Sequence, residues 1–340
     1  MRTFDLKDGK ILVIGDLHLS DYYKGKHKNY LQNCFDVMDS LDKIITVRKP
    51  DAIVLLGDLV GWTKPNIVDR ERLTKFFKFF VKWGRTAKIF AVKGNHDLNG
   101  YPDFMMLSEL NLIITSVACD GYFDLYSADN EMVPSARFHI VDYGEEHRQL
   151  NIAPQPTGNV VFGHNNFTIA GQTTWYSGGE GIELGHLANF AEVDMVISGH
   201  IHNPSPDFCE TSMLNGKNCT LFYPGCPTRP VFEKNNMYNS VKLVEISYNK
   251  TTELTDFDII DMPLKPYEEI FDLSGVDLTE KTQDEIDEEM RKAALSDVLG
   301  DLLTYRMNQT DPISQIANIP NATEEAKAMA MSYLQTAMDG

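Results

Sequence analysis

Five short apolar runs recur in the first two hundred residues of this chain, and each ends in a glycine that is followed by a polar side chain. The runs are ILVIG, AIVLLG, IFAVKG, NVVFG and VDMVISG, which end at Gly15, Gly57, Gly94, Gly163 and Gly199. Nearly continuous Ile, Val, Leu and Phe over this length predict strands that are buried on both faces, as in α/β proteins. We therefore expect a sheet whose strands all end in the same kind of polar loop.

Helical periodicity lies between the early strands. Residues 30–45 place apolar side chains at helical spacing, and residues 70–84 do so again, with Gly84 where a helix would end. Strand and helix thus alternate, which is typical of an α/β domain. Further strands, predicted to complete a second sheet, lie at 136–143, 219–225 and 240–248. The expected fold class is a two-sheet α/β sandwich core.

The composition changes near residue 262, where strand-like sequence gives way to acidic helical sequence. We therefore predict a core domain over residues 1–262, a short cap or linker over 263–279 and a C-terminal helical extension over 280–340. The extension also concentrates negative charge. The whole chain of 340 residues carries a net charge of −18, and residues 265–340 hold 16 acidic but only 6 basic residues.

The negative net charge of the chain limits the classes of function that fit the sequence. An acidic chain is not the usual footprint of a protein that binds nucleic acid alone, so a phosphate substrate would need positive charge from another source. No apolar stretch reaches 18 residues and the first ten residues are polar, so we expect no membrane span or signal peptide and a cytoplasmic protein, in the host cytoplasm if phage-encoded. Five cysteines without a C-x-x-C pair argue against a disulfide framework and a structural zinc site.

The polar residues at the strand ends are oxygen and imidazole donors, which suit Mn²⁺, Fe²⁺ or Zn²⁺. They are Asp16, His18, Asp58, Asn95, His164, His200 and His202. Loops at the carboxyl ends of such strands are where α/β proteins assemble their sites. A lone Gly-His pair is more often an ordinary loop histidine, but seven such residues at five strand ends are specific as a set. Seven ligands are too many for one ion and suit two ions that share a carboxylate.

The order D-x-H, G-D, G-N-H-D, G-H and G-H-x-H resembles the calcineurin-like metallophosphoesterase superfamily. The resemblance implies a first ion held by Asp16, His18, Asp58 and His202, and a second held by Asp58, Asn95, His164 and His200. It makes Asp58 the bridge. Two divalent ions are implied, with Mn²⁺ as the expected metal and Fe²⁺ or Zn²⁺ as alternatives.

A dinuclear centre makes hydroxide available from water at neutral pH, poised to attack phosphorus. His96 stands next to the predicted ligand Asn95 but is not itself assigned to an ion. We expect His96 to donate a proton to the leaving oxygen or to stabilise the transition state, and Asp97 to orient its imidazole.

Within the superfamily, the chain looks most like the nuclease subunits of SbcD-type double-strand-break repair complexes, including the small recombination nucleases of T-even-like phages. The segments that carry this similarity are GDLVGWTKPN at 57–66, YPGCPTRP at 223–230, the spacing between the last two histidine motifs, and the acidic tail. The resemblance implies a DNA exonuclease or endonuclease subunit. The chain departs from many relatives because it leaves room only for a short cap, contributed by residues 250–275.

The resemblance also implies partners. Residues 280–308 and 321–337 predict two amphipathic helices, which would clamp the coiled coil of an SbcC-type ATPase through residues 280–340. Such a partner would supply much of the DNA-binding surface. The alternative is that both helices pack back on the core. Relatives dimerise through helices that correspond to 28–48 and 70–83 here, although ordinary core packing explains the same apolar residues.

Two other function classes stay open. A small-molecule or cyclic-nucleotide phosphodiesterase of the same superfamily would share every metal ligand and differ in the cap and the tail. A non-catalytic scaffold would keep the fold without the ions. Scaffolds of this kind typically lose ligands, whereas all seven are present here together with His96.

Overall fold

The computed structural model describes residues 4–20, 26–60, 70–99, 101–129, 132–154, 157–169, 181–232, 237–249, 251 and 254–274. Contacts within the chain group residues Met1–Ser274 into one compact unit and Gly275–Gly340 into another. The predicted helical extension 280–340 and the last part of the predicted cap or linker lie outside the described residues. The domain boundaries therefore stay predictions.

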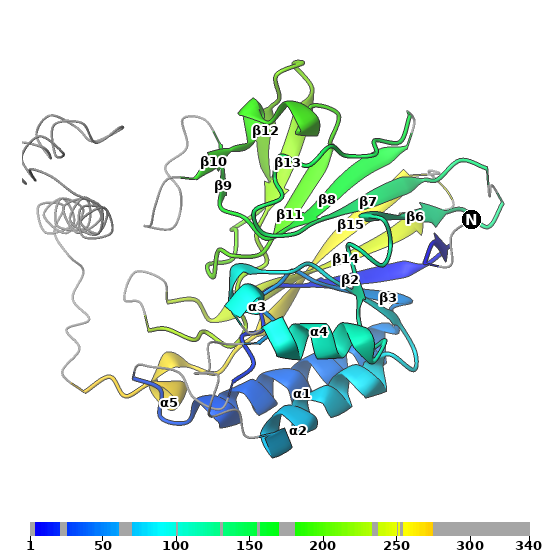
Figure 1. Ribbon diagram of the computed structural model, residues 1–340. Coiled ribbons are helices and arrows are strands. Elements are labelled where there is room, and N and C mark those ends of the chain that lie inside the picture. The colour runs from blue at the N-terminus through cyan, green and yellow to red at the C-terminus, as the bar shows by residue number, and fades with distance from the viewer. Residues whose placement is uncertain are drawn as a thin grey trace, which may run out of the picture. The chain divides into compact units, whose positions relative to one another are not determined.

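Two sheets form the core of the first unit (Figure 1). The six-stranded sheet runs in the order β15 (Leu254–Pro263), β14 (Ser240–Asn249), β2 (Lys10–Ile14), β3 (Ala52–Leu55), β4 (Lys88–Ala91) and β5 (Ile114–Thr115). The seven-stranded sheet runs in the order β1 (Leu6–Lys7), β6 (Tyr122–Tyr126), β7 (Ala136–Val141), β8 (Gly158–Gly163), β11 (Met195–Ser198), β13 (Asn218–Phe222) and β12 (Cys209–Ser212). A separate pair joins β9 (Phe167–Thr168) to β10 (Ile182–Glu183).

The two sheets pack face to face, which confirms the predicted sandwich. The rings of Phe90 on β4 and Phe123 on β6 stack across the interface with centroids 3.9 Å apart, and buried side chains of both sheets form one apolar cluster. The strands that carry the predicted ligands, β2, β3, β4, β8 and β11, pair in parallel with neighbours of their own sheet. Their carboxyl ends are therefore collected at one edge of the core.

Helices cover the outer face of the six-stranded sheet (Figure 1). They are α1 (Tyr30–Arg48), α2 (Arg70–Trp83) and α4 (Tyr101–Glu109), and the short α3 (Asn95–Asn99) precedes α4. The side chain of Asn29 caps the start of α1 by accepting a hydrogen bond from the N–H of Gln32 at 3.1 Å. Two 3₁₀ turns, η1 (Leu184–His186) and η2 (Ala188–Phe190), lie beside the other sheet.

The helices α1 and α2 pack on each other and on the sheet. Phe35 stacks on Phe76 at 4.6 Å, and Phe80 and Trp83 are buried in the same cluster. Lys82 of α2 pairs with Asp42 of α1 at 2.5 Å. The apolar faces of both helices are thus used inside the chain, and the homodimer through residues 28–48 and 70–83 stays a prediction.

The described part of the predicted cap packs against the core. Residues 254–263 form β15, an edge strand that pairs with β14 over its whole length. The short helix α5 (Tyr267–Ile270) follows, and the N–H of Lys28 donates to the carbonyl of Ile270 at 2.9 Å. Residues 254–263 therefore form a strand of the six-stranded sheet, because their alternating side chains are compatible with pairing to β14.

Two smaller findings concern the composition. All five cysteines lie among the described residues, and none forms a disulfide. In the part of the chain that the structure describes, no helix combines the length and the apolar character needed to cross a membrane.

The buried His139 on β7 predicts a dependence of stability on pH. Burial lowers the pKa of His139 to about 4, although the nearby Asn159 side chain opposes the shift. The unfolded chain binds a proton near pH 6.5 and the folded chain does not, so stability is lost as the pH falls from about 6.5 toward 4. The unaltered chain should lose unfolding free energy between pH 7.5 and pH 5, and we expect this loss to be about 2 kcal/mol smaller in His139→Gln.

Urea unfolding at the two pH values measures this difference. His147→Gln is the matched control, because the His147 side chain is 79% exposed. If the His139→Gln chain lost as much stability on acidification as the unaltered chain, the neutral state of His139 would be the wrong explanation.

Candidate metal centre

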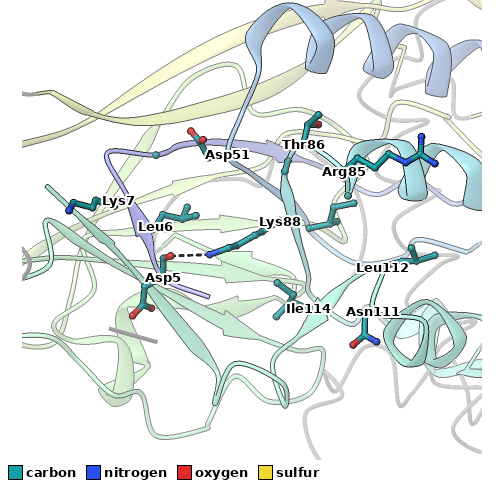
Figure 2. A pocket seen from close by; sticks show the side chains of 14 residues that line it. Asp5, Leu6, Lys7, Asp51, Arg85, Thr86, Lys88, Asn111, Leu112 and Ile114 are labelled. Atoms are coloured by element: carbon teal, nitrogen blue, oxygen red, sulfur yellow. Dashed lines mark hydrogen bonds between the residues drawn. The ribbon is translucent and has the colours of Figure 1, made fainter. Parts of the chain in front are cut away.

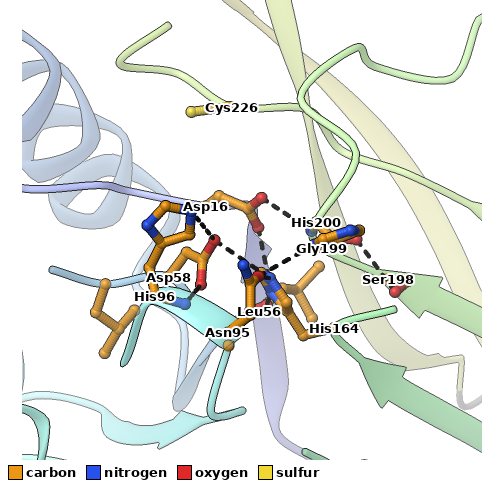
Figure 3. Close-up of polar contacts among 12 residues, drawn as sticks. Asp16, Leu56, Asp58, Asn95, His96, His164, Ser198, Gly199, His200 and Cys226 are labelled. Atoms are coloured by element: carbon orange, nitrogen blue, oxygen red, sulfur yellow. Dashed lines mark hydrogen bonds and ion pairs between the residues drawn. The ribbon is translucent and has the colours of Figure 1, made fainter. Parts of the chain in front are cut away.

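The structure brings all seven predicted ligands together at the carboxyl ends of five strands. Asp16 and His18 follow β2, Asp58 follows β3, Asn95 follows β4, His164 follows β8, and His200 and His202 follow β11. Figure 3 shows five of them, Asp16, Asp58, Asn95, His164 and His200, converging from both sheets onto one region. The site therefore bridges the two halves of the sandwich.

Asp58 occupies the centre of this group. Its Oδ2 lies 3.3 Å from His164 Nε2, 3.5 Å from His18 Nε2 and 4.0 Å from His96 Nε2. One carboxylate thus faces histidines that the sequence assigned to two different ions. This is the position that a bridging ligand needs.

The other ligands form two groups around Asp58, and Asp16 contacts both, since its Oδ1 also lies 3.7 Å from His164 Nδ1. On one side, His18 Nε2 and His202 Nε2 are 3.0 Å apart, and His202 Nε2 is 3.9 Å from Asp16 Oδ2. On the other side, Asn95 Oδ1 lies 3.1 Å from His164 Nε2 and 3.2 Å from His200 Nδ1. Among the described residues, the clusters Asp16–Asp58–His164 and His18–Asp58–His96 are able to hold a metal ion.

Three of the predicted ligands lie in the left-handed region of backbone conformation. Eight described residues other than glycine have a positive φ, and three of them are the predicted ligands His18 (43°), Asp58 (47°) and His200 (77°). Residues other than glycine rarely adopt a positive φ, and the residues that do so cluster at functional sites. The N–H of His18 also donates to the carbonyl of Asp58 at 2.7 Å, which ties the first two ligand loops together.

The chain orients some ligands toward the centre. His164 Nδ1 donates to the carbonyl of Leu56 at 2.6 Å, which turns Nε2 toward Asp58 and Asn95. Metal-binding histidines usually fix their second nitrogen in this way. The N–H of His200 donates to Asp16 Oδ2 at 2.9 Å, whereas the buried Asp16 Oδ1 has no hydrogen-bond partner among the described residues. A buried carboxylate oxygen left over in this way fits a cation.

Charge within the chain is only partly balanced. Burial opposes charge on Asp58 and His164, but their mutual attraction prevails: the pKa of Asp58 lies well below its usual range, and that of His164 rises to about 9. Burial and the Asp58 carboxylate hold the pKa of Asp16 well above its usual range. Burial lowers the pKa of both His200 and His202 to about 4, so both rings are neutral at pH 7. Neutral imidazole is the form that binds metal ions.

The centre is open on one side. Asp16, His18, Asp58 and His164 are buried, at most 1% exposed, whereas the side chains of His96 and His202 are 24% and 31% exposed. A substrate therefore approaches from the side of His96 and His202.

The expected contact between Asp97 and the His96 imidazole is not what the structure shows. Asp97 is fully buried and accepts hydrogen bonds from the N–H groups of Leu59 (3.0 Å), Val60 (3.4 Å) and Gly94 (2.9 Å). Both residues lie on α3, and consecutive residues of a helix do not face each other. Asp97 therefore joins the loops after β3 and β4 instead of holding the His96 ring. Burial and the nearby Asp58 raise the pKa of Asp97 to about 7.

A separate cavity of about 540 Å³ lies away from this group of residues. Its lining includes Leu6, Asp51 and Lys88, which sit at the amino ends of strands, and none of the seven predicted ligands (Figure 2). Lys88 Nζ donates to the carbonyl of Asp5 at 3.0 Å. We place the chemistry at the carboxyl ends of the strands, because the buried charges and the convergent donors are there.

The sequence analysis missed one residue at the centre. Cys226 belongs to the segment YPGCPTRP, which was noted only for its family resemblance. In the structure the Cys226 sulfur forms a third possible ligand group with His18 and His202. The signal in the sequence was a thiol directly after the glycine of a strand-end loop.

Comparison with known proteins identifies the family. The calcineurin-like phosphoesterase family matches residues 9–204, which include every predicted ligand. The chain belongs to the calcineurin-like phosphoesterase family, and it is a hydrolase. Its two-sheet α/β architecture is that of metallophosphoesterases.

Individual relatives are distant. The SbcD component of the SbcCD nuclease from Staphylococcus saprophyticus is 23% identical over 92% of this chain and 83% of its own length. A solved structure of a Staphylococcus aureus protein, described as a candidate 5′-nucleotidase, matches with a TM-score of 0.40 and 15% identity over 84% of this chain and 57% of that chain. A Thermus thermophilus structure matches with a TM-score of 0.40 and 12% identity over 74% of this chain and 98% of that chain.

The close packing around Gly199 yields a test of the site geometry. A Cβ atom added to Gly199 would collide with Asp16 Oδ1 and with the backbone carbonyl of Leu56. We expect Gly199→Ala to lower the free energy of unfolding by about 1–3 kcal/mol and to weaken metal binding, because the loop that carries His200 must move.

Gly158→Ala is the matched control. It lies on β8 of the same sheet, and the nearest atom to its added Cβ is 3.8 Å away. Thermal unfolding and metal titration of both variants measure the effect. Equal stability and equal metal affinity in the two variants would contradict the packing described around Gly199.

Proposed function

We propose that this chain is a metal-dependent DNA nuclease, the counterpart of SbcD in a recombination and repair complex. The observation that carries the proposal is the convergence of seven oxygen and imidazole donors around Asp58, on a fold that belongs to a phosphoesterase family. The similarity to the SbcD component of an SbcCD nuclease over 92% of the chain supports DNA as the substrate class.

The donor set fits two divalent cations. Asp16, His18, Asp58 and His202 would hold the first, and Asp58, Asn95, His164 and His200 would hold the second. The mixture of carboxylate, amide and imidazole donors favours Mn²⁺, with Fe²⁺ or Zn²⁺ as alternatives. When bound, such ions supply positive charge for the phosphate oxygens and acidify water to give a nucleophile at neutral pH.

The chain's own residues position the substrate and move the proton. His96 lies at the open side: its backbone N–H donates to Asp58 Oδ1 at 2.9 Å, and its ring Nε2 lies 4.0 Å from Asp58 Oδ2. Burial lowers the pKa of the His96 ring, and an anionic phosphate next to it would oppose that shift. The ring can then donate a proton to the leaving oxygen. Asp97 acts through the backbone, since it holds the loops that carry Asp58 and Asn95.

The substrate class is tested by Mn²⁺-dependent hydrolysis of linear duplex DNA, single-stranded DNA and cyclic nucleotides under the same conditions. We expect cleavage of DNA and no turnover of the cyclic nucleotides. Turnover of a cyclic nucleotide with DNA left intact would instead favour the small-molecule phosphodiesterase.

The central position of Asp58 predicts different outcomes for two variants. Asp58→Asn removes the shared carboxylate, so we expect no hydrolysis and less bound metal at both positions. His96→Ala removes a proton donor and none of the seven proposed ligands, so it should keep both metals and lose about 10²- to 10⁴-fold in rate. Elemental analysis of the purified variants counts the ions, and steady-state hydrolysis of DNA gives the rates.

His186→Ala is the control for the loss of a histidine. It alters another Gly-His pair, whose ring is 71% exposed and pairs with Glu183 at 3.2 Å. The role assignment would be wrong if the His96→Ala chain lacked an ion while the Asp58→Asn chain retained two.

The acidic tail is proposed to bind the coiled coil of an SbcC-type ATPase. All seven proposed ligands belong to the compact unit Met1–Ser274. We expect a chain that ends at Ser274 to fold, to load metal and to cut short single strands. It should no longer co-purify with the ATPase, and it should lose ATP-dependent processing of duplex ends.

Calorimetry with the purified ATPase measures this interaction for the full and the shortened chain. Unchanged affinity after removal of residues 275–340 would refute the role of the tail. A shortened chain that failed to fold would instead favour helices that pack back on the core.

A further inference from the structure

We propose that Cys226 is an additional, sulfur ligand at the first metal position and makes that position selective for thiophilic ions such as Zn²⁺ and Cd²⁺. This inference rests on the proposed metal centre. The set of ligands derived above contains only oxygen and nitrogen donors, so a thiolate would change which metals the position prefers.

The geometry places the sulfur among the ligands of the first ion. The ligand atoms of His18, His202 and Cys226 all lie within 4.8 Å of one another. Figure 3 shows Cys226 on the loop that passes over the group formed by Asp16 and Asp58. Zn–S bonds of about 2.3 Å and Zn–N bonds of about 2.0–2.1 Å bring ligands on one ion to separations of this order.

The backbone holds Cys226 firmly in this place. Its N–H donates to the carbonyl of His202 at 2.8 Å, and its carbonyl accepts from the Tyr238 hydroxyl at 2.6 Å. On the other side of the loop, the Thr228 hydroxyl donates to the carbonyl of Leu17, the residue before His18, at 2.9 Å. The loop of Cys226 is therefore tied to the loops of both histidines.

A close backbone approach explains why the loop comes so near. Gly225 has a φ of 88°, and its carbonyl lies where a Cβ atom of Gly15 would be. Glycine at both positions lets the chain before Cys226 touch the chain before Asp16. The fully buried sulfur contacts the Thr228 hydroxyl at 3.5 Å. This contact does not explain why residue 226 is a cysteine, because a side-chain hydroxyl could make it as well.

The binding step is a ligand exchange. The S–H bond of Cys226 breaks, the proton passes to solvent water, and a sulfur lone pair forms the bond to the metal ion. No electron is transferred. Mn²⁺ is a hard ion that prefers oxygen ligands, so it gains little from the sulfur, whereas Zn²⁺ and Cd²⁺ gain much more.

The experiment compares metal binding by three full-length chains that have been freed of metal with a chelator. Cys226→Ser keeps a hydroxyl beside Thr228 but removes the sulfur. Cys219→Ser is the matched control, because Cys219 is also fully buried and outside any disulfide but belongs to a different apolar cluster. We expect Cys226→Ser to weaken Cd²⁺ binding at least about tenfold and to leave Mn²⁺ binding within about twofold.

A direct signature accompanies the affinities. The unaltered chain loaded with Cd²⁺ or Co²⁺ should show a sulfur-to-metal charge-transfer absorption that is absent in Cys226→Ser and present in Cys219→Ser. X-ray absorption of the unaltered Zn²⁺ form should show one sulfur at about 2.3 Å. This measurement needs no variant, so a spectrum without sulfur overturns the inference even if Cys226→Ser does not fold.

The outcomes separate this inference from the proposed metal centre. Binding of two Mn²⁺ ions with no sulfur signature for Zn²⁺, Cd²⁺ or Co²⁺ overturns the role of Cys226 and leaves the centre intact. Failure to bind any of these ions overturns both. A sulfur signature that persists in Cys226→Ser assigns it to another cysteine and also overturns the inference.

Discussion

The burial of three carboxylates at one edge of two sheets is the constraint on which the rest of this site depends. Asp16, Asp58 and Asp97 are each at most 1% exposed, and burial together with the Asp58 charge raises the pKa of the other two. A buried charge is costly unless it is paired. The chain pairs Asp58 with His164 and surrounds Asp97 with backbone N–H groups, but it leaves Asp16 Oδ1 without a hydrogen bond among the described residues. A bound cation would satisfy this carboxylate oxygen.

Holding these groups together shapes the backbone of three of the five ligand loops. His18, Asp58 and His200 adopt a positive φ, although none of them is a glycine. Strain of this kind persists where the surrounding structure over-determines the conformation, and here buried strands on both sheets fix the loops at their bases. The sandwich core therefore supplies the stability that the ligand loops lack. This division between a rigid core and strained loops keeps the donors in place before an ion or a substrate arrives.

Much of this site was predictable because its signals are local. Each ligand loop follows a buried strand and a glycine, so the sequence pattern alone indicated the strand ends and the donors. The partners of Asp97 were not predictable in this way, since its neighbour His96 points elsewhere on α3 and the amides that it binds come from the loop after β3. The position of Cys226 depends on the contact between Gly15 and Gly225, which only the tertiary fold creates. The pairing of β15 with β14 is likewise a tertiary choice, because the strand pattern near residue 260 does not say which strand it joins.

The charges of the described residues also bear on the proposed roles of metal ions and of a partner in handling a phosphate substrate. The open side of the centre presents His96, His200 and His202, and burial lowers the pKa of each, so these rings carry no positive charge at pH 7. Behind them, the Asp58 carboxylate is balanced by His164, whose pKa of about 9 keeps its ring protonated at pH 7. Several cations of the chain are engaged elsewhere: Lys82 pairs with Asp42, and Lys28 Nζ donates to the carbonyl of Glu268. The metal-free chain therefore offers a phosphodiester no net positive charge at the centre. Bound ions would supply that charge at the reacting phosphate, and in the proposed complex a second protein would supply it for the more distant phosphates of DNA.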